Sequence, residues 1–558
     1  MELAIKEITE IKRNNSEKYI FNREDDYLTL KAYFPNLKSK KYIKNLNSQI
    51  KEYSFLGKKN NLLSKKIKLY RGHLSQKLNT IHNVHYNAEY WGFLIDSFLA
   101  DFVGGIISQV DSLQSVKKKF KNTYINYLDY NYCAYNSIEV HQALQRDVHV
   151  KQIFTAKIAN ILNLKIIGKK IKKKKFYQSQ STNIFRKIVI FLFTKFIEIF
   201  FKVFRPNFIV SDYFEIKKKN LISVKIFKNF YIPSYFFNSR KKFHINKEKR
   251  LKLFVPEKDI IDKSFNKLII NFFPSSYLEN YLKYKKKIDI FAKYSNSFIC
   301  STSYRVDDSL KILAAELKLR KKKLIYISHA PFENLRTQSR SYNFCKKYHD
   351  EIYRTTETNY GRHVSYNLKK YQVKKNKSNI KIIIYDTVSR TLSLNKFLNS
   401  SLETYPTLNS NILFYQKLNK ENKNTTMIKT FPSNDIREQI SKNIWTKFSL
   451  NKKNIISKRC KFDELYNYDI LILNEFSTPL FEALLTYRPF ILIYGNIIDN
   501  LNQKTKENFL KLKKLKIIFK SPNEAATFLN KNKSKYYGDW KNVIENKNYL
   551  NFRKILIN

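Results

Sequence analysis

The sequence predicts an α/β protein built on parallel sheets, with a mainly helical N-terminal portion. From residue 290 onward, short and continuously apolar segments alternate with helical stretches, which is typical of parallel sheets covered by helices on both faces. The first 150 residues are mainly helical in their pattern. The chain has 558 residues, 43% of them apolar, which is enough for two large domains with sizeable cores.

The predicted elements follow in order from residue 295. Residues 295–302 form a predicted strand, 307–322 an amphipathic helix and 323–329 a second strand. Further strands are predicted at 380–387, 411–418, 425–431, 468–473, 490–495 and 516–521. The charged, asparagine-rich segment 369–379 predicts a linker between two domains.

The linker divides the chain into two predicted domains. The N-terminal domain covers 1–368, with its α/β part at about 207–368, and the C-terminal domain covers 380–530. Residues 531–558 are predicted to form a C-terminal helix that packs back toward the N-terminal domain.

A basic insert at about 165–206 precedes the α/β part. Six lysines lie between 169 and 175, and in the following segment 184–206 the charged side chains fall on one stripe of an apolar helix. Two interpretations stay open. The helix either lies in the interface of an anionic membrane, where lysines and aromatic side chains reinforce each other, or belongs to the core beneath a lysine-rich loop. Charges within the run argue against a membrane-spanning helix.

The formal charge of +59 predicts anionic partners, such as phosphorylated substrates, phospholipid or nucleic acid. Lys, Asn, Ile, Phe and Tyr are all abundant, so the codon bias of an AT-rich genome explains part of this charge equally well. Nucleic acid is the less favoured partner, because the lysines are spread along the chain and no recognised nucleic-acid-binding motif is present.

Four cysteines, Cys133, Cys300, Cys345 and Cys460, lie far apart without the spacing of a zinc or disulfide site. This usage predicts a reducing compartment. Because the N-terminus also lacks the long apolar core of a signal peptide, we expect a cytoplasmic protein.

The turn between the predicted strands 468–473 and 490–495 is the main candidate binding site. Thr478 fits an N-cap and Pro479 the first helical position. The free amides and dipole of a helix start attract phosphate, and the hydroxyls of Ser477 and Thr478 can add donors. Glu482, one turn further on, can accept hydrogen bonds from ribose hydroxyls. An ordinary capped helix with a surface glutamate is the alternative.

Two further strand ends carry candidate residues. His329 ends the predicted strand 323–329 and is followed by Glu333, a pair that suits a general base and its orienting group. Lys429 lies near the end of the strand 425–431 and can neutralise a diphosphate. The alternatives are an ordinary loop histidine and a solvated lysine.

The segment 78–91 places His82, Tyr86 and Glu89 on one face of a predicted helix, with His85 beside them. The spacing departs from that of zinc-binding helices. An acceptor-binding or catalytic surface and a purely structural polar cluster both stay open.

Five segments carry a family resemblance: 78–102, with its Asn79-x-x-His82 and Tyr90-Trp91 pairs, then 273–281, 314–330, 477–493 and 517–543. In this order they resemble a family of transferases encoded in bacterial surface-carbohydrate gene clusters. The resemblance implies a GT-B-like fold, in which two Rossmann-like domains face a cleft. It also implies transfer of a sugar or related group from a nucleotide-sugar donor to a glycan or lipid-linked acceptor.

On this reading Ser477, Thr478, Glu482 and Lys429 bind the donor. His329 or Glu333 acts as base or orienter, and His82, His85, Tyr86 and Glu89 lie on the acceptor side or support the site. Because no Asp-x-Asp motif ends a strand, we expect no obligatory metal and no cofactor. A lipid-linked acceptor implies a cytoplasmic enzyme at the inner face of the membrane.

The sequence departs from the family pattern after the histidine. The family has Gln-His-Gly-Gly where this chain has Ser328-His329-Ala330-Pro331, and the loss of both glycines narrows the approach of a ligand. A catalytically inactive scaffold is therefore one alternative. The others are a polyol-phosphate transferase of the glycerol-phosphate type and a basic nucleic-acid-binding protein.

Overall fold

The computed structural model of the chain describes part of the sequence. The residues it describes are 3–5, 18–20, 42–43, 53–119, 123–129, 132–146, 148–170, 196, 198–210, 229–232, 245–300, 307–327, 340–353, 371–374, 377–386, 410–430, 445, 452–456, 467–474, 476, 478–495, 498 and 501–557. His329, Glu333, Ser477 and Cys460 lie outside these ranges, as does most of the basic insert.

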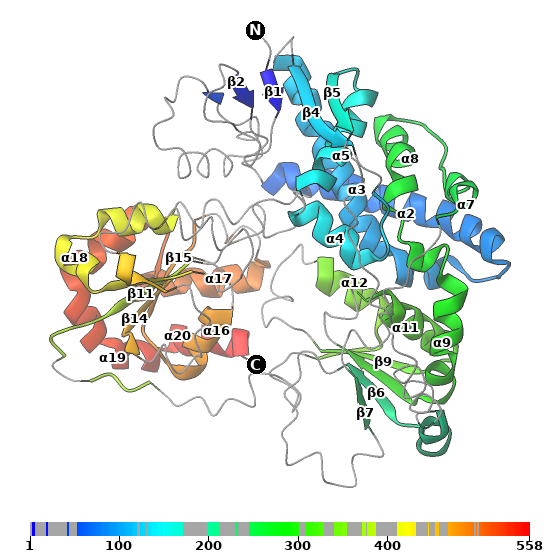
Figure 1. Cartoon of the computed structure of the whole chain (residues 1–558). Coiled ribbons are helices and arrows are strands. Elements are labelled where there is room, and N and C mark those ends of the chain that lie inside the picture. Colours follow the sequence, from blue (N-terminus) through cyan, green and yellow to red (C-terminus); the bar gives the residue numbers. More distant parts are fainter. Residues whose placement is uncertain are drawn as a thin grey trace.

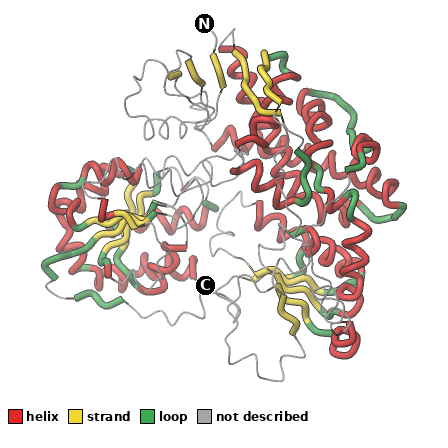
Figure 2. The backbone as a smooth tube through the Cα atoms, viewed as in Figure 1, coloured by secondary structure: helices red, strands yellow, loops and turns green. Residues whose placement is uncertain are grey.

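The described residues form three parallel sheets flanked by helices (Figures 1 and 2). The first has the order β3-β2-β1-β4-β5 and consists of β1 (Leu3–Ile5), β2 (Lys18–Ile20), β3 (Tyr42–Ile43), β4 (Thr123–Asp129) and β5 (Lys165–Lys170). The second has the order β10-β9-β8-β6-β7 and consists of β6 (Asn207–Val210), β7 (Asn229–Ile232), β8 (Ser297–Cys300), β9 (Lys323–Ile327) and β10 (Glu351–Tyr353). The third has the order β13-β12-β11-β14-β15-β16 and consists of β11 (Ile382–Tyr385), β12 (Thr426–Lys429), β13 (Ile455–Ile456), β14 (Ile470–Leu473), β15 (Phe490–Ile493) and β16 (Ile518–Phe519).

The predicted α/β class with parallel sheets is confirmed, and so is a helical N-terminal portion. A five-stranded sheet also lies in that portion, which the sequence analysis did not predict. Its first three strands are only two or three residues long, so they carry no recognisable alternation.

Helices of the first 350 residues share one hydrophobic core. They are α2 (Tyr53–His82), α3 (Ala88–Lys119), α4 (Ser137–Arg146), α5 (Val148–Ile161), α7 (Lys247–Leu251), α8 (Ile260–Phe272), α9 (Tyr281–Tyr294), α11 (Asp308–Leu319) and α12 (Arg340–Tyr348). Helix α3 lies at the centre and contacts α2, α4, α5, α8 and α11. Its length and composition would allow it to cross a membrane, but 83% of its most apolar window is buried inside the protein. It is therefore the central helix of this core.

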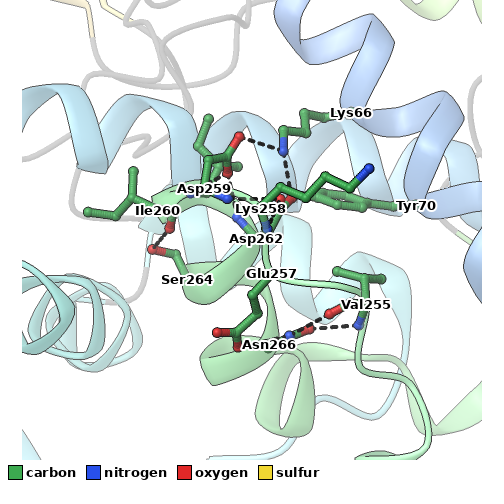
Figure 3. A network of polar contacts seen from close by, with 11 residues as sticks. Lys66, Tyr70, Val255, Glu257, Lys258, Asp259, Ile260, Asp262, Ser264 and Asn266 are labelled. Atoms are coloured by element: carbon green, nitrogen blue, oxygen red, sulfur yellow. Dashed lines mark hydrogen bonds and ion pairs between the residues drawn. The ribbon is translucent and has the colours of Figure 1, made fainter.

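A polar network fixes α8 against α2 (Figure 3). Asp259 and Asp262 form a capping box at the start of α8, so two backbone amides and two carboxylates satisfy each other. Lys66 of α2 lies 2.7 Å from Asp259 Oδ2 and 2.6 Å from Asp262 Oδ1, and the Tyr70 hydroxyl donates to the same Oδ1 at 2.5 Å. Every member has a partner within the network, so it stabilises the helix pair and offers no vacant binding group.

The third sheet has a separate hydrophobic core drawn from residues 380–556. Its helices are residues 410–417, α14 (Lys420–Asn424), α16 (Thr478–Thr486), α17 (Gln503–Lys511), α18 (Pro522–Gly538), α19 (Trp540–Glu545) and α20 (Lys547–Ile557). The strand predicted at 411–418 is helical up to residue 417, and Asn411, Phe414, Tyr415 and Leu418 are buried at the spacing of one helix face.

The C-terminal helices pack on this same sheet. Tyr536 donates to the Phe490 carbonyl at 2.5 Å, Trp540 Nε1 to the Tyr487 carbonyl at 2.8 Å and Arg553 Nε to the Leu484 carbonyl at 3.0 Å. The described residues of 531–558 thus pack on the third sheet, and the expected packing toward the N-terminal domain stays a prediction. The apolar side chains of these helices belong to the hydrophobic core of the third sheet.

Part of the segment predicted as a linker also lies on the third sheet. The Tyr371 amide donates to the Thr486 carbonyl at 2.8 Å, and the Lys374 amide donates to the Tyr537 hydroxyl at 3.1 Å. Lys377 Nζ lies 2.7 Å from Asp469 Oδ1. The described residues of this segment are thus bound to the C-terminal part of the molecule.

Candidate functional site

The strand order of the third sheet defines where a ligand is best placed. Counted along the chain within this sheet, the order is 3-2-1-4-5-6, so the direction of winding reverses between β11 and β14. In open parallel sheets, loops leave such a reversal point in opposite directions, and ligands bind at the carboxyl ends of the two strands beside it.

A buried polar cluster occupies this position. Asp386 follows β11 and Asn474 follows β14, while Asn411 is the second residue of the helix 410–417. Asn411 Nδ2 lies 3.3 Å from Asp386 Oδ1, and Asn474 donates to Asn411 Oδ1. Trp445 Nε1 donates to the other oxygen of Asp386 at 2.7 Å. These contacts join residues up to 88 positions apart in the sequence, from 386 to 474, into one rigid group.

Because this cluster is buried, substitutions within it are expected to lower the free energy of unfolding. Asp386 and Asn474 are 2% exposed, and Asn411 and Trp445 are fully buried. A buried carboxylate is stable only when hydrogen bonds replace its hydration, and here an indole and an amide supply two of them. The cluster is therefore a buried, hydrogen-bonded group of polar side chains at the carboxyl ends of β11 and β14.

The predicted donor-binding turn begins directly beyond Asn474. Helix α16 starts at Thr478, one residue before the predicted first position, so Pro479 still lies in its first turn. Because α16 follows the carboxyl end of β14, its amino end lies at the edge that carries the polar cluster. Glu482 is in the second turn and is half-buried. Ser477 and the side chain of Thr478 lie outside the described residues.

Lys429 is the last residue of β12, in register with Tyr385 of β11. It is 7% exposed, and its ammonium donates to the Thr430 carbonyl at 2.8 Å. It is therefore a buried cation at the same edge of the sheet, where the alternative was a solvated lysine. Four of the candidate residues thus follow or end β11, β12 and β14: Asp386, Lys429, Asn474 and Thr478.

The second sheet carries a carboxyl-edge candidate that the sequence analysis missed. Asp307 caps α11, and its Oδ1 accepts from the amides of Ser309 at 2.9 Å and Leu310 at 3.4 Å. Its Oδ2 is buried and has no hydrogen-bond partner in the part of the chain that the structure describes. Burial, with the negative charge of Asp308 adding to it, raises the pKa of Asp307 to about 7. The available signal was a pair of carboxylates at a helix start shortly after a strand.

The neighbouring Asp308 is fully engaged. It accepts from the Ser137 amide at 2.9 Å, from the Tyr277 hydroxyl at 2.6 Å and from the Ser276 hydroxyl. Lys311 Nζ lies 3.6 Å from its Oδ1. Asp308 therefore holds three segments together, whereas Asp307 Oδ2 has no hydrogen-bond partner among the described residues. His329, predicted to follow β9 in the same sheet, lies outside the described residues.

The segment 78–91 is not one helix, which corrects the predicted common face. Helix α2 ends at His82, Asn83 adopts a left-handed conformation (φ 51°), and α3 begins at Ala88. Asn79 fixes the turn, because its side chain bonds the amide and the carbonyl of Tyr86 and accepts from Trp91 Nε1. His85 and Glu89 are exposed and Tyr86 is half-buried.

His82 is a structural residue in this turn. Its Nε2 lies 3.0 Å from the Tyr277 carbonyl, so this nitrogen carries the proton. Burial lowers the pKa of His82 to about 4, and the imidazole is neutral at pH 7. It packs between Trp91 and Tyr281, with ring centroids at 5.9 and 4.6 Å. His82 therefore supports the turn, because its Nε2 proton is engaged by the Tyr277 carbonyl and its ring is packed between two aromatic side chains.

Three of the segments that carry the family resemblance meet at one point. Tyr90 lies in the first segment, Tyr281 in the second and Glu316 in the third. The Tyr90 hydroxyl lies 2.6 Å from the Tyr281 hydroxyl and 2.8 Å from Glu316 Oε1. Lys285 lies 3.6 Å from the same Glu316 oxygen and donates to the Tyr86 hydroxyl. The sequence pattern that marks the family therefore builds a contact between α3, α9 and α11.

The family model for LIC12162 family transferases matches residues 10–546. The chain belongs to this family. None of the curated proteins compared with it matches the chain. The matched region of this transferase includes the polar clusters of the second and third sheets and the junction of Tyr90, Tyr281 and Glu316.

Metal binding has no support among the described residues. No group of three or more His, Cys, Asp or Glu side chains in the described ranges is arranged to hold an ion. Cys300 and Cys345 are buried thiols, and burial raises the pKa of Cys300, which keeps it protonated. The expectation of a reaction without a metal stays a prediction.

Proposed function

We propose that this transferase moves a sugar or related group from a nucleotide donor to a surface polysaccharide or a lipid-linked glycan. The single observation that carries the proposal is the reversal point of the third sheet, where a buried polar cluster lies at the carboxyl ends of β11 and β14, immediately before the start of α16. A nucleotide is the ligand class that open parallel sheets bind at this place.

The proposed donor pose follows from the charges at that edge. The amides and dipole at the start of α16 attract the donor phosphates, with the hydroxyls of Ser477 and Thr478 as further donors. Glu482 accepts from the ribose hydroxyls. Lys429 adds a positive charge at the end of β12. Asp386, Asn411 and Asn474 hold the strand ends at fixed separation and so keep the site preorganised.

In the proposed reaction the bond between the transferred group and the donor phosphate breaks, and an acceptor hydroxyl forms the new bond. The acceptor proton passes to a base, and the negative charge of the leaving nucleotide is stabilised by α16 and Lys429. His329, oriented by Glu333, is the predicted base. Asp307 is a second candidate, because a carboxyl group with a pKa of about 7 and an unengaged oxygen is poised for proton transfer.

The proposed architecture is GT-B-like, with the second and third sheets as two Rossmann-like domains facing a cleft. The acceptor then lies on the side of the second sheet, near the exposed rim of the α2–α3 turn with His85, Tyr86 and Glu89. This division is supported by the two separate hydrophobic cores, one for each side.

Donor binding is the decisive test. The purified chain is screened by thermal shift and calorimetry against uridine, cytidine, guanosine and thymidine diphosphates and their sugar conjugates. A ligand at 100 times its dissociation constant stabilises the protein by about 2.7 kcal/mol. Glu482→Gln is expected to weaken the selected nucleotide at least about tenfold, a loss of about 1.4 kcal/mol, with folding unchanged.

Glu545→Gln is the matched control, because Glu545 is exposed at the end of α19 and belongs to the same domain. Equal nucleotide affinity in the Glu482 variant, the control and the unaltered chain contradicts the donor-site assignment. Selective binding of a nucleotide-linked polyol such as cytidine diphosphate glycerol selects the polyol-phosphate transferase instead.

A further inference from the structure

An apolar helix face lies exposed just before β6. Residues 198–204 are helical, as is Phe196, and the chain enters β6 at Asn207. Phe196 is 65% exposed, Ile199 62%, Val203 65% and Phe204 44%. We call these four side chains the apolar face. Their spacing of three, four and one residues places them on one side of the helix.

The opposite side of this helix is firmly packed. Phe201 is fully buried, with its ring centroid 4.8 Å from Phe230, 5.0 Å from Phe291 and 6.1 Å from Phe208. These rings come from β7, α9 and β6. The helix is therefore fixed on the second sheet by one side, and the apolar face is held outward by that packing.

The concentration of apolar side chains here is unusual for this chain. In the other described ranges, large exposed apolar residues are spread over many elements, with at most two on one element or its edge. They are Leu69, Leu251, Phe254, Leu282, Leu319, Tyr353, Leu413, Leu510 and Leu550. Single exposed apolar residues need no explanation, whereas a contiguous group marks an interaction surface.

Charge indicates what covers this face. Lys202 lies within the same helix, half-exposed and 3.2 Å from Glu198, and the exposed Arg205 follows the last helical turn. The sequence preceding the helix holds six lysines between 169 and 175, and the whole chain carries +59. An apolar helix face flanked by basic residues matches an anionic bilayer, which offers both an acyl boundary and negative headgroups.

We propose that the face formed by Phe196, Ile199, Val203 and Phe204 docks on the surface of an anionic phospholipid bilayer. The helix lies in the plane of the interface and inserts its apolar side chains among the headgroups, while the exposed Lys202 and Arg205 lie beside the anionic lipid. Because the helix leads directly into β6, docking brings the second sheet to the membrane. This last consequence rests on the proposed function, since it delivers a lipid-linked acceptor to the side where acceptor binding is proposed.

The experiment compares two double variants of the full-length chain in vesicle flotation. Ile199→Ser with Val203→Ser removes apolar area from the proposed face. Leu282→Ser with Leu319→Ser is the matched control, since these side chains are 54% and 44% exposed on α9 and α11. Vesicles contain either phosphatidylcholine alone or phosphatidylcholine with phosphatidylglycerol, and far-ultraviolet circular dichroism verifies that all variants fold.

We expect the unaltered chain and the control to bind the anionic vesicles and to bind neutral vesicles at least about tenfold more weakly. The Ile199 and Val203 variant is expected to lose at least about tenfold in affinity for the anionic vesicles. Equal binding by this variant and the control overturns the proposal, as it would show that lysines alone or general hydrophobicity drive adsorption. So does a change of oligomeric state without lipid that is specific to this variant, because the face would then bind protein.

Measuring nucleotide affinity on the same variants distinguishes a failure of the membrane proposal from a failure of the proposed function. The variants are expected to bind the selected nucleotide as the unaltered chain does, because the apolar face belongs to the second sheet and the donor site to the third. A chain that docks on vesicles and binds no nucleotide upholds the membrane proposal and contradicts the transferase mechanism. A chain that binds nucleotide and ignores anionic vesicles does the reverse.

Discussion

Each edge of the third sheet buries an aspartate, and different kinds of hydrogen-bond donor stabilise the two carboxylates. At the amino edge, Asp469 is 1% exposed and accepts from Lys377 Nζ at 2.7 Å, from the Tyr371 hydroxyl at 2.7 Å and from the Lys381 amide at 2.8 Å. At the carboxyl edge, Asp386 is 2% exposed and accepts from Trp445 and Asn411.

The two aspartates differ in which parts of the chain supply their hydrogen-bond donors. The partners of Asp469 come from the segment that leads into the sheet, so this carboxylate ties the chain down and its charge is matched by a lysine. Asn411, the amide donor of Asp386, accepts in turn from Asn474, and α16 starts beyond Asn474. Helix starts gather only at the carboxyl edge of a parallel sheet, so the same residue type serves stability at one edge and a ligand at the other.

The largest expected effect is at the amino edge. Asp469→Ala leaves Lys377 and a backbone amide without their buried acceptor, and removing one partner of a buried pair costs about 3–5 kcal/mol. Denaturant unfolding measures this loss, and nucleotide affinity of the folded fraction is expected to stay unchanged. A loss of nucleotide affinity at full stability would reverse the roles assigned to the two edges.

In the second sheet, the buried carboxyl group of Asp307 predicts that folding stability depends on pH. The folded pKa of Asp307 is raised to about 7, above its value in the unfolded chain, so the folded state holds the extra proton and stability declines as pH rises from about 4 to about 7. The stability at stake is on the order of 4 kcal/mol at most. Asp307→Asn keeps a capping side chain and is expected to flatten this slope in unfolding measured from pH 5 to 8.

Asp289→Asn is the control for that series, since Asp289 has a half-exposed side chain. An unchanged slope in the Asp307 variant would mean that the buried carboxyl group is ionised throughout. It would then be unsuited to the role of proton acceptor proposed for it.

A moderate effect is expected at the carboxyl edge. In Asp386→Asn the amide turns one donor toward Trp445 or Asn411, which are donors themselves, and an unsatisfied buried group costs about 1–3 kcal/mol. Because the strand ends shift with it, nucleotide affinity is expected to decline as well. If calorimetry finds the affinity intact while the protein is destabilised, Asp386 is only a structural carboxylate like Asp469.

The smallest expected loss of stability is also at the amino edge. Lys377→Gln removes the cation and keeps a hydrogen-bond donor for Asp469, so the expected loss is about 1 kcal/mol in unfolding free energy. Lys374→Gln is the control, because the backbone amide of Lys374 makes its contact and the side chain is exposed. Equal stabilities of both variants would show that Tyr371 and the Lys381 amide suffice for Asp469.

The sequence predicted those elements whose signal is local. The apolar runs at 380–387, 468–473 and 490–495 contain β11, β14 and β15, because a strand buried on both faces must be apolar at every position. The helix after Asn474 was likewise visible from Thr478 and Pro479. The strand predicted at 411–418 was wrong, since a short apolar run does not distinguish the two periods until burial is known.

The polar clusters could not be predicted in this way. Asp386, Asn411 and Trp445 meet only because the order of the strands brings their ends together, and no spacing in the sequence encodes that order. Tyr90, Tyr281 and Glu316 meet for the same reason. Sequence similarity marked the segments that contain them, yet their contact depends on how three helices pack.

The binding of Tyr371, Lys374 and Lys377 to the third sheet has a practical consequence for dissecting the molecule. A fragment cut at residue 380, where the first apolar strand begins, would lose two of the three partners of Asp469, Lys377 and Tyr371. It would also lose the contact to the Thr486 carbonyl and the amide bonded to Tyr537. A fragment that starts before residue 371 keeps them all. The functional boundary of an autonomous C-terminal half thus lies upstream of its first strand, and any pivot between the halves must lie upstream of Tyr371 too.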